Sequence, residues 1–161
     1  MSVEVRPATD EDLDAAVDLY ADVATEGRWI AAEAPVNKLE RRATFESSIR
    51  KDNAQFFVAD DGGRIVGELG IELASYGVAD FGMMVAADAR GRGVGSALLS
   101  AAIEWARAAG AHKVALQVWP DNQGAIALYR KFGFDQEGHL RRHYRRRNGE
   151  LWDAVIMGLN L

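Results

Sequence analysis

The sequence contains no cysteine, and this absence excludes disulfide bonds, thiolate metal sites and a cysteine acyl-enzyme. No apolar run approaches the roughly 20 residues that a membrane-spanning helix needs. The first 12 residues show no positively charged segment followed by an apolar one, so no secretory leader is expected. No spacing of carboxylates or histidines suggests metal ligands. We therefore expect a cytoplasmic protein with neither a metal site nor a membrane partner.

The apolar content is sufficient for one hydrophobic core. The 161 residues are 48% apolar, which predicts a single domain over residues 1–161. The net charge is −5 at pH 7, and in so acidic a chain we expect the one dense basic cluster to be a solvated hairpin rather than a nucleic-acid interface. The cluster consists of Arg141, Arg142, Arg145, Arg146 and Arg147.

Periodicity and turn signals predict mostly antiparallel strands with one parallel crossover in the middle of the chain. The expected strands are 3–6, 55–59, 64–73, 78–85, 113–118, 139–147 and 150–159, the last two flanking an Asn148-Gly149 turn. A first helix is expected after N-cap candidates and first-turn acids at 9–12, and it carries Leu13, Val17, Leu19 and Tyr20. Two further helices are expected over 38–50 and from Gly93 to near Gly110. The last expected helix is capped by Asp121 or Asn122 and runs to Lys131, with Gly133 in the left-handed position after it.

Two consequences follow from this order. The strand before Gly93 and the strand at 113–118 are joined by a helix, which makes them parallel neighbours in an α+β fold. Residues 24–36 show no sustained period, so they are expected to form an irregular loop or lid beside the substrate.

The segment from Arg90 to Ser96 has glycine at three alternate positions, directly between a strand and a helix. Without Cβ atoms, successive backbone N–H groups can turn toward an anion, and the helix N-terminus adds positive potential. A P-loop requires Lys and Ser or Thr after its last glycine, and a dinucleotide fingerprint requires glycine where Ser96 stands. The turn therefore predicts a diphosphate cradle of another kind.

The pattern Arg90, Gly93 and Gly95 resembles the acetyl-CoA motif of the GNAT superfamily of N-acetyltransferases. A second segment with Asn122, Tyr129, Gly133 and Phe134 is similar to that family's Asn-x-x-Ala-x-x-Leu-Tyr-x-x-x-Gly-Phe motif, at the same distance from the glycines. The resemblance covers nearly the whole chain. It implies the GNAT (acyl-CoA N-acyltransferase) fold, a mixed, bent and splayed β-sheet with helices on both faces, and acetyl-CoA as cosubstrate.

The resemblance also implies where acetyl-CoA binds. Backbone N–H groups of 91–96 hold the diphosphate, arginines supply positive charge, and the pantetheine inserts where the strand before the turn separates from 113–118. An N–H near Val85 then stabilises the oxyanion, a contribution of about 3–4 kcal/mol in enzymes of this kind. The expected cofactor residues are Met84, Val85, Arg90, Gly91, Arg92, Gly93, Val94, Gly95, Ser96, Asn122, Ala125 and Tyr129.

Tyr129 is the expected general acid, because a phenol within reach of the sulfur can protonate the departing thiolate. The general base stays open among Glu72, Asp80 and Glu33. In the branch that acetylates ribosomal-protein N-termini a Glu occupies the position of Gln117, and Gln cannot accept the proton. Glu33 is alternatively a ligand of the acceptor amine. The expected acceptor-site residues are Trp29, Glu33, Phe81 and Gln117, with Ile30, Tyr144 and Trp152 as further candidates.

The sequence thus predicts an acetyl-CoA-dependent N-acetyltransferase in which a primary amine attacks directly in a ternary complex. Small amino acids, related amines and peptide N-termini are all possible acceptors. The arginines at 141–147 favour an acceptor with a carboxylate. A non-catalytic acyl-CoA-binding sensor is the alternative. Resemblance to a bacterial amino-acid acetyltransferase branch and the exposed closing hairpin suggest a homodimer.

Overall fold

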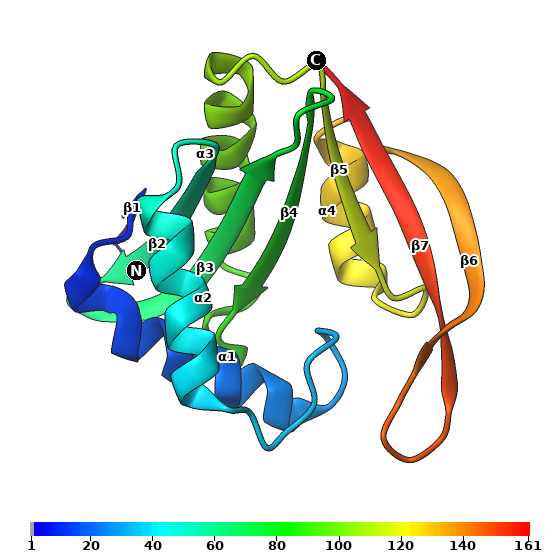
Figure 1. The fold of residues 1–161 in the computed structure, drawn as a ribbon, viewed down its shortest axis with the longest axis horizontal. Coiled ribbons are helices and arrows are strands. Elements are labelled where there is room, and N and C mark those ends of the chain that lie inside the picture. Colours follow the sequence, from blue (N-terminus) through cyan, green and yellow to red (C-terminus); the bar gives the residue numbers. More distant parts are fainter. Residues whose placement is uncertain (1) are drawn as a thin grey trace.

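The computed structural model describes residues 2–161, which form a single sheet with helices on both of its faces (Figure 1). The strands are β1 (Val3–Pro7), β2 (Ala54–Asp61), β3 (Arg64–Leu73), β4 (Val78–Val85), β5 (Lys113–Val118), β6 (Asp135–Arg145) and β7 (Leu151–Asn160). The helices are α1 (Leu13–Glu26), α2 (Lys38–Arg50), α3 (Val94–Ala108) and α4 (Gln123–Lys131), with short 3₁₀ turns at Asp10–Asp12 and Ala87–Ala89.

The sheet opens between β4 and β5. Its strand order is β1-β2-β3-β4-β5-β7-β6, and β4 and β5 are the parallel pair. These two strands pair only at Val78–Asp80 with 113–115, after which 81–85 and 116–118 have no pairing with each other. In Figure 1 the two strands lie side by side near the top and separate toward the bottom. The splay implied by the family resemblance is therefore confirmed.

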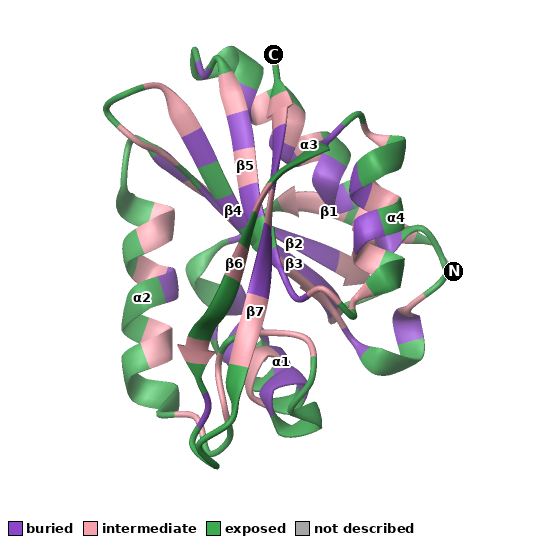
Figure 2. Ribbon diagram, turned by 90° about the vertical axis from the view of Figure 1, so that its right-hand side faces the viewer, coloured by how far each residue is buried: buried purple, intermediate pink, exposed green. Residues whose placement is uncertain are grey.

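Alternation along β2 explains why both faces of the sheet are covered. Phe56 and Val58 pack with Phe45 and the buried face of α1, whereas Phe57 and Ala59 belong to the core that contains α3. Successive side chains of a strand point to opposite faces, so two helical layers bury the two sets. In Figure 2 α2 lies on one side of the sheet and α3 and α4 lie on the other.

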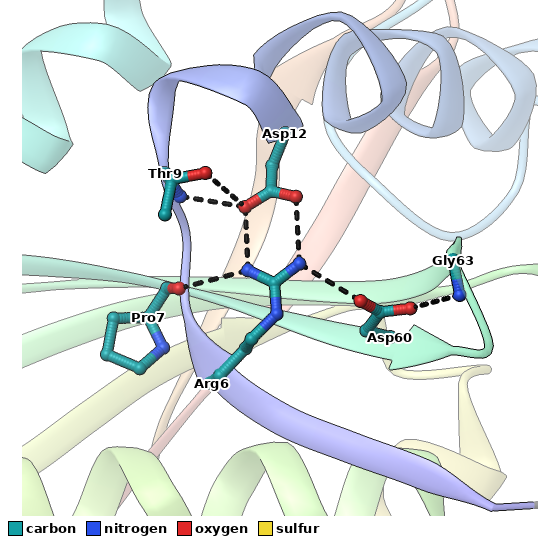
Figure 3. Close-up of polar contacts among 6 residues, drawn as sticks. All are labelled: Arg6, Pro7, Thr9, Asp12, Asp60 and Gly63. Atoms are coloured by element: carbon teal, nitrogen blue, oxygen red, sulfur yellow. Dashed lines mark hydrogen bonds and ion pairs between the residues drawn. The ribbon is translucent and has the colours of Figure 1, made fainter.

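A polar cluster ties β1 to the turn before α1 and to β2 (Figure 3). The Arg6 guanidinium donates to both oxygens of Asp12, at 2.8 and 3.0 Å, and to Asp60 at 3.0 Å. Asp12 also accepts from the backbone N–H of Thr9 at 2.7 Å. These bonds, chiefly the one from Arg6, lower the pKa of Asp12. The cluster fixes the edge strand at which the chain enters the sheet.

Most predicted elements are present, and their bounds differ where long-range contacts decide them. The first predicted helix is preceded by the 3₁₀ turn at Asp10–Asp12, extends to Glu26 and ends at Gly27, which has φ +68°, so the irregular loop is shorter than expected. The closing hairpin was predicted to start at residue 139, but β6 begins at Asp135. It contains a register shift between Leu140 and Tyr144, where Arg142 has φ +50°. Such a bulge leaves no local periodic signal.

Within the described residues 2–161, no helix is long and apolar enough to cross a membrane.

Candidate active site

A cleft of about 820 Å³ occupies the wedge between β4 and β5. Its walls come from the unpaired ends of these strands, from the glycine turn, from α4 and from the loop after α1. Of the predicted site residues it brings together Trp29, Phe81, Met84, Val85, Arg90, Gly91, Gly93, Val94, Gly95, Ser96, Gln117, Asn122, Ala125 and Tyr129. Arg92, Glu33, Glu72 and Asp80 are not among the lining residues.

The glycine turn has the geometry that an anion cradle requires. Gly91 and Gly93 have φ of +75° and +84°, and a Cβ on either would enter open space. A side chain there would be strained and would occupy the room in front of the backbone N–H groups at the start of α3. Gly95 has a different role, because its Cβ would lie 3.2 Å from Leu128 of α4. The residues present thus fit a bound diphosphate.

Arg90 is engaged with the protein itself. Its guanidinium makes two hydrogen bonds to Glu26, of 2.7 and 2.8 Å, and its Nε donates to the carbonyl oxygen of Val85 at 3.1 Å. It also lies 5.3 Å from the ring centroid of Trp29. The contact with Arg90, before that with Trp29, lowers the pKa of Glu26. Arg90 therefore braces the strand end and the glycine turn against α1.

The start of α4 confirms the predicted cap. The Asn122 side chain accepts from the backbone N–H of Ala125 at 3.2 Å. This bond fixes the first turn of the helix beside the cleft. One face of α4 then carries Asn122 and, two turns later, Tyr129.

Tyr129 is held by aromatic contacts and keeps its hydroxyl available. The ring is 7% exposed and lies 5.8 Å from the rings of both Phe81 and Phe134. No residue within 2–161 hydrogen-bonds its hydroxyl, although the side chain lines the cleft. Burial raises the pKa of Tyr129 to about 12. The phenol therefore keeps its proton at neutral pH and can donate it into the cleft.

The far end of the cleft is built from aromatic and amide groups. The Tyr144 hydroxyl donates to Gln117 Oε1 at 2.5 Å, which orients the Gln117 amide. The Tyr144 ring packs edge-on against Trp119 at 5.2 Å. Ile30 also lines the cleft, while Trp152 lines a separate hollow rather than the cleft. Five of the seven expected acceptor-site residues thus line the cleft, namely Trp29, Ile30, Phe81, Gln117 and Tyr144.

The three carboxylates proposed as bases have different surroundings. Glu72 is exposed and pairs with Lys51 at 2.8 Å. Glu33 accepts from the backbone N–H of Arg147 at 3.0 Å. Asp80 is at the last position at which β4 pairs with β5, immediately before the cleft-lining residues begin. Asp80 is exposed, and partial desolvation of its carboxyl raises the pKa of Asp80.

The basic hairpin is not uniformly solvated, and that expectation is wrong for Arg146. This side chain is 5% exposed, stacks 4.1 Å from the Trp152 ring centroid and donates to the carbonyl oxygen of Ala31 at 2.9 Å. Arg147 donates to the carbonyl oxygen of Ala34 at 2.7 Å. An arginine-rich turn in sequence gives no sign of this, because its partners are more than 110 residues away.

Sequence reasoning missed Trp119, Arg28 and Glu68. Trp119 lines the cleft, and strand alternation from Gln117 would have indicated it. Arg28 also lines the cleft and forms no ion pair within residues 2–161. Glu68 is 1% exposed on β3, and neither carboxylate oxygen has a partner in the described chain. Burial raises its pKa well above the ordinary value.

Across residues 2–161 no group of three or more His, Cys, Asp or Glu side chains is arranged to hold a metal ion.

Comparisons with known proteins agree with this geometry. The model of the acetyltransferase (GNAT) family matches residues 13–134. The chain is 30% identical over 171 aligned residues to an L-methionine sulfoximine/L-methionine sulfone acetyltransferase of Pseudomonas paraeruginosa, covering 100% of this chain and 96% of that protein. It is 40% identical to the L-amino acid N-acetyltransferase AaaT of Escherichia coli, over 59% of this chain and 61% of that protein.

Among solved structures, the chain is similar to a ribosomal-protein-alanine N-acetyltransferase from Brucella melitensis. The TM-score is 0.89 and the identity 29%, covering 98% of this chain and 99% of that one. The fold is therefore shared over nearly the whole length of both chains.

Proposed function

The chain belongs to the GNAT acetyltransferase family, whose members carry acetyl groups from acetyl-CoA to amines, and from this we propose that its acceptor is a small amino acid with a free carboxylate. The full-length relative from Pseudomonas acts on amino-acid derivatives, as its name states. Gln117, rather than a carboxylate, at the end of β5 is the departure from the ribosomal-protein branch. Arg28 offers an unpaired guanidinium at the cleft wall within the described chain.

The single observation that carries this proposal is the common cleft. One wedge in the sheet holds a glycine turn suited to a diphosphate, a small aromatic pocket and a buried phenol whose hydroxyl has no hydrogen-bond partner in the described residues 2–161. When bound, acetyl-CoA supplies the acetyl group as an activated thioester. We assign the backbone of 91–96 and the side chain of Asn122 to holding it, and the unpaired edge of β4 to orienting its acyl end.

Proton transfers are assigned to two residues. Tyr129 donates a proton to the sulfur of the leaving thiolate, and its raised pKa keeps the phenol protonated until the bond breaks. Asp80 accepts the proton that the amine loses, directly or through water. Its raised pKa makes it a better base than an ordinary aspartate, and Glu72 and Glu33 are already engaged with other groups. Direct attack of the amine requires no covalent enzyme intermediate.

We also propose a cytoplasmic location and a homodimer. The support for the dimer is β6, which ends the sheet and has mostly exposed residues along an unpaired edge. Size-exclusion chromatography with light scattering tests it, and a monomer at assay concentration contradicts it.

The test of the function is release of free CoA thiol with a panel of amines. We expect release with free amino acids, and slower release with the corresponding decarboxylated amines. A protein that binds acetyl-CoA in calorimetry but releases no thiol with any amine would be an acyl-CoA sensor instead. Equal rates with amino acids and decarboxylated amines would support acetyl transfer to amines but would overturn the proposed preference for an acceptor with a carboxylate.

A further inference from the structure

The closing hairpin and the loop after α1 are joined by a bridge at the acceptor end of the cleft. Arg146 donates to the carbonyl oxygen of Ala31 at 2.9 Å, and Ala31 is itself a wall residue of the cleft. Glu33 accepts from the backbone N–H of Arg147 at 3.0 Å, and its carboxylate lies 3.7 Å from Arg146 Nε. Two segments more than 110 residues apart thus meet beside the acceptor pocket.

A second hollow of about 260 Å³ lies on the other side of this bridge. Glu33, Arg146 and Trp152 line the hollow and do not line the cleft, whereas Ala31 and Trp119 line the cleft and not the hollow. Arg146 packs 4.1 Å from the ring of Trp152 and 5.4 Å from that of Trp119. The bridge, together with the contacting rings of Trp119 and Trp152, whose centroids are 5.1 Å apart, is therefore a partition between the cleft and the hollow.

We infer that the partition formed by Glu33 and Arg146 limits the length of the acceptor to a single amino acid. This inference rests on the proposed function and deepens it. The partition is stable because a guanidinium this deeply buried is satisfied by a carbonyl, a carboxylate and two indole rings at once. Glu33 and Arg146 are positioning residues, because the contacts that they make are with the protein.

The size limit has a simple physical basis. Under the proposed function, the acceptor amine lies near Tyr129 and its carboxyl group lies in the part of the cleft lined by Gln117, Trp119 and Tyr144. A second residue attached to that carboxyl group has to cross the partition into the hollow. Crossing separates Arg146 from Ala31 and leaves a buried cation without this hydrogen-bond acceptor, which is unfavourable.

The experiment compares three acceptors built on one L-amino acid that the wild type accepts. They are the free amino acid, its carboxamide, and the dipeptide in which alanine is attached to its carboxyl group. The carboxamide removes the carboxylate without adding length. For the wild type we expect kcat/KM for the dipeptide to be lower than for the carboxamide by about 100-fold. For Glu33→Ala and Arg146→Met we expect this ratio to fall by about tenfold or more, with KM for acetyl-CoA changed by less than about twofold.

Two further variants distinguish a loss of substrate discrimination from a nonspecific effect of substitution. Glu33→Gln keeps an oxygen that accepts from the Arg147 N–H, so its discrimination is expected to stay near that of the wild type. Arg145→Ala removes the same charge from an exposed neighbouring position, and its substrate ratio should be unchanged. Amide exchange at Arg147 reports the bridge without any assay of activity, and we expect it to be at least about tenfold faster in Glu33→Ala.

Several outcomes overturn the inference. One is a wild type that acetylates the dipeptide as well as the carboxamide, which leaves the acetyl-transfer function intact. Another is an Arg147 amide that exchanges equally fast with and without Glu33, because the bridge is then absent in solution. If no amine gives thiol release, the proposed function and this inference are both overturned. In that case the Arg147 amide is still protected from exchange, which shows that the bridge is intact in a protein without activity.

Discussion

Glu26 at the end of α1 and Arg90 before the glycine turn share two hydrogen bonds, of 2.7 and 2.8 Å, although 64 positions separate them. The pair is partly exposed, with about a third of each side chain accessible. Arg90 also contacts the Val85 carbonyl, so the same guanidinium holds the end of β4. The first helix is thereby connected to the strand end and to the turn that line the cleft.

Glu26→Gln should raise KM for acetyl-CoA about fivefold while kcat stays nearly constant, because the glycine turn loses its bidentate brace. Steady-state kinetics with acetyl-CoA as the varied substrate measures this. Asp22→Asn removes one negative charge from an exposed position of the same helix and serves as the control. A lowered KM in Glu26→Gln would instead mean that a freed Arg90 binds the phosphates of the cofactor.

Tyr129→Phe should lower the rate of the chemical step by about 100-fold, because the departing thiolate loses its proton donor. Affinity for acetyl-CoA should be nearly unchanged, since the ring contacts with Phe81 and Phe134 persist. Single-turnover measurements isolate the chemical step. Tyr76→Phe, at a residue that is 69% exposed, is the matched control. A chemical step of normal rate in Tyr129→Phe would exclude this residue as the acid.

Gly93→Val should abolish acetyl-CoA binding in calorimetry. Valine at φ +84° is strained, and its side chain would enter the open cradle in front of the helix N-terminus. Gly62→Val is the control, because Gly62 has φ +61° and equally open surroundings in a distant turn. Both variants should lose thermal stability, and only Gly93→Val should lose the ligand. Normal binding by a folded Gly93→Val protein would contradict the location of the cradle.

Asp80→Asn should lower kcat/KM for the amine by about tenfold or more and should remove the acidic limb of the pH profile. The wild-type limb arises because the base works only when ionised, so activity falls as pH falls through the raised pKa of Asp80. Glu72→Gln, on the neighbouring strand, should leave the profile unchanged. A limb that persists in Asp80→Asn assigns the base to another group.

Glu68→Gln should stabilise the protein at neutral and alkaline pH. Burial raises the pKa of Glu68 in the folded state above the ordinary 4.5, so the folded state binds more protons. The contribution of Glu68 to the free energy of unfolding should therefore be most favourable below pH 4.5. It should fall by about 1.4 kcal/mol per pH unit as the pH rises from there to the pKa of Glu68 in the folded state.

Urea unfolding of wild type and Glu68→Gln from pH 5 to pH 8 measures this difference. Glu72→Gln on the same strand is the control, since its carboxylate is half exposed and paired with Lys51. The stability gain of Glu68→Gln should grow with pH. A gain that is constant over this range, or a loss, would show that Glu68 is ionised in the folded protein.

Prediction from sequence succeeded where a local conformation carries the function. Asn122 was expected to cap α4, and its side chain accepts from Ala125 as expected. Gly133 was expected at the left-handed end of that helix, and it has φ +96°. Capping geometry and positive φ depend on a few adjacent residues, so a single sequence is sufficient to find them.

Prediction was weaker for charged side chains, whose surroundings are assembled from distant segments. Glu33, Glu72 and Asp80 were equivalent in sequence, and the structure pairs the first two with Arg147 and Lys51. Arg146 was expected in solvent and is buried against two tryptophans that contact each other. The desolvation of each group depends on which strands pair, and local patterns do not contain that information.

The sequence by itself determined the glycine turn, the crossover between two parallel strands and the helix that carries Asn122 and Tyr129, because backbone conformation and apolar periodicity are local properties. Tertiary structure alone decided that Glu68 is buried without a partner among residues 2–161, that Arg90 braces α1 and that Arg146 lies against a second hollow beside the cleft. Each of these depends on contacts between residues tens of positions apart, which form only when the sheet is assembled.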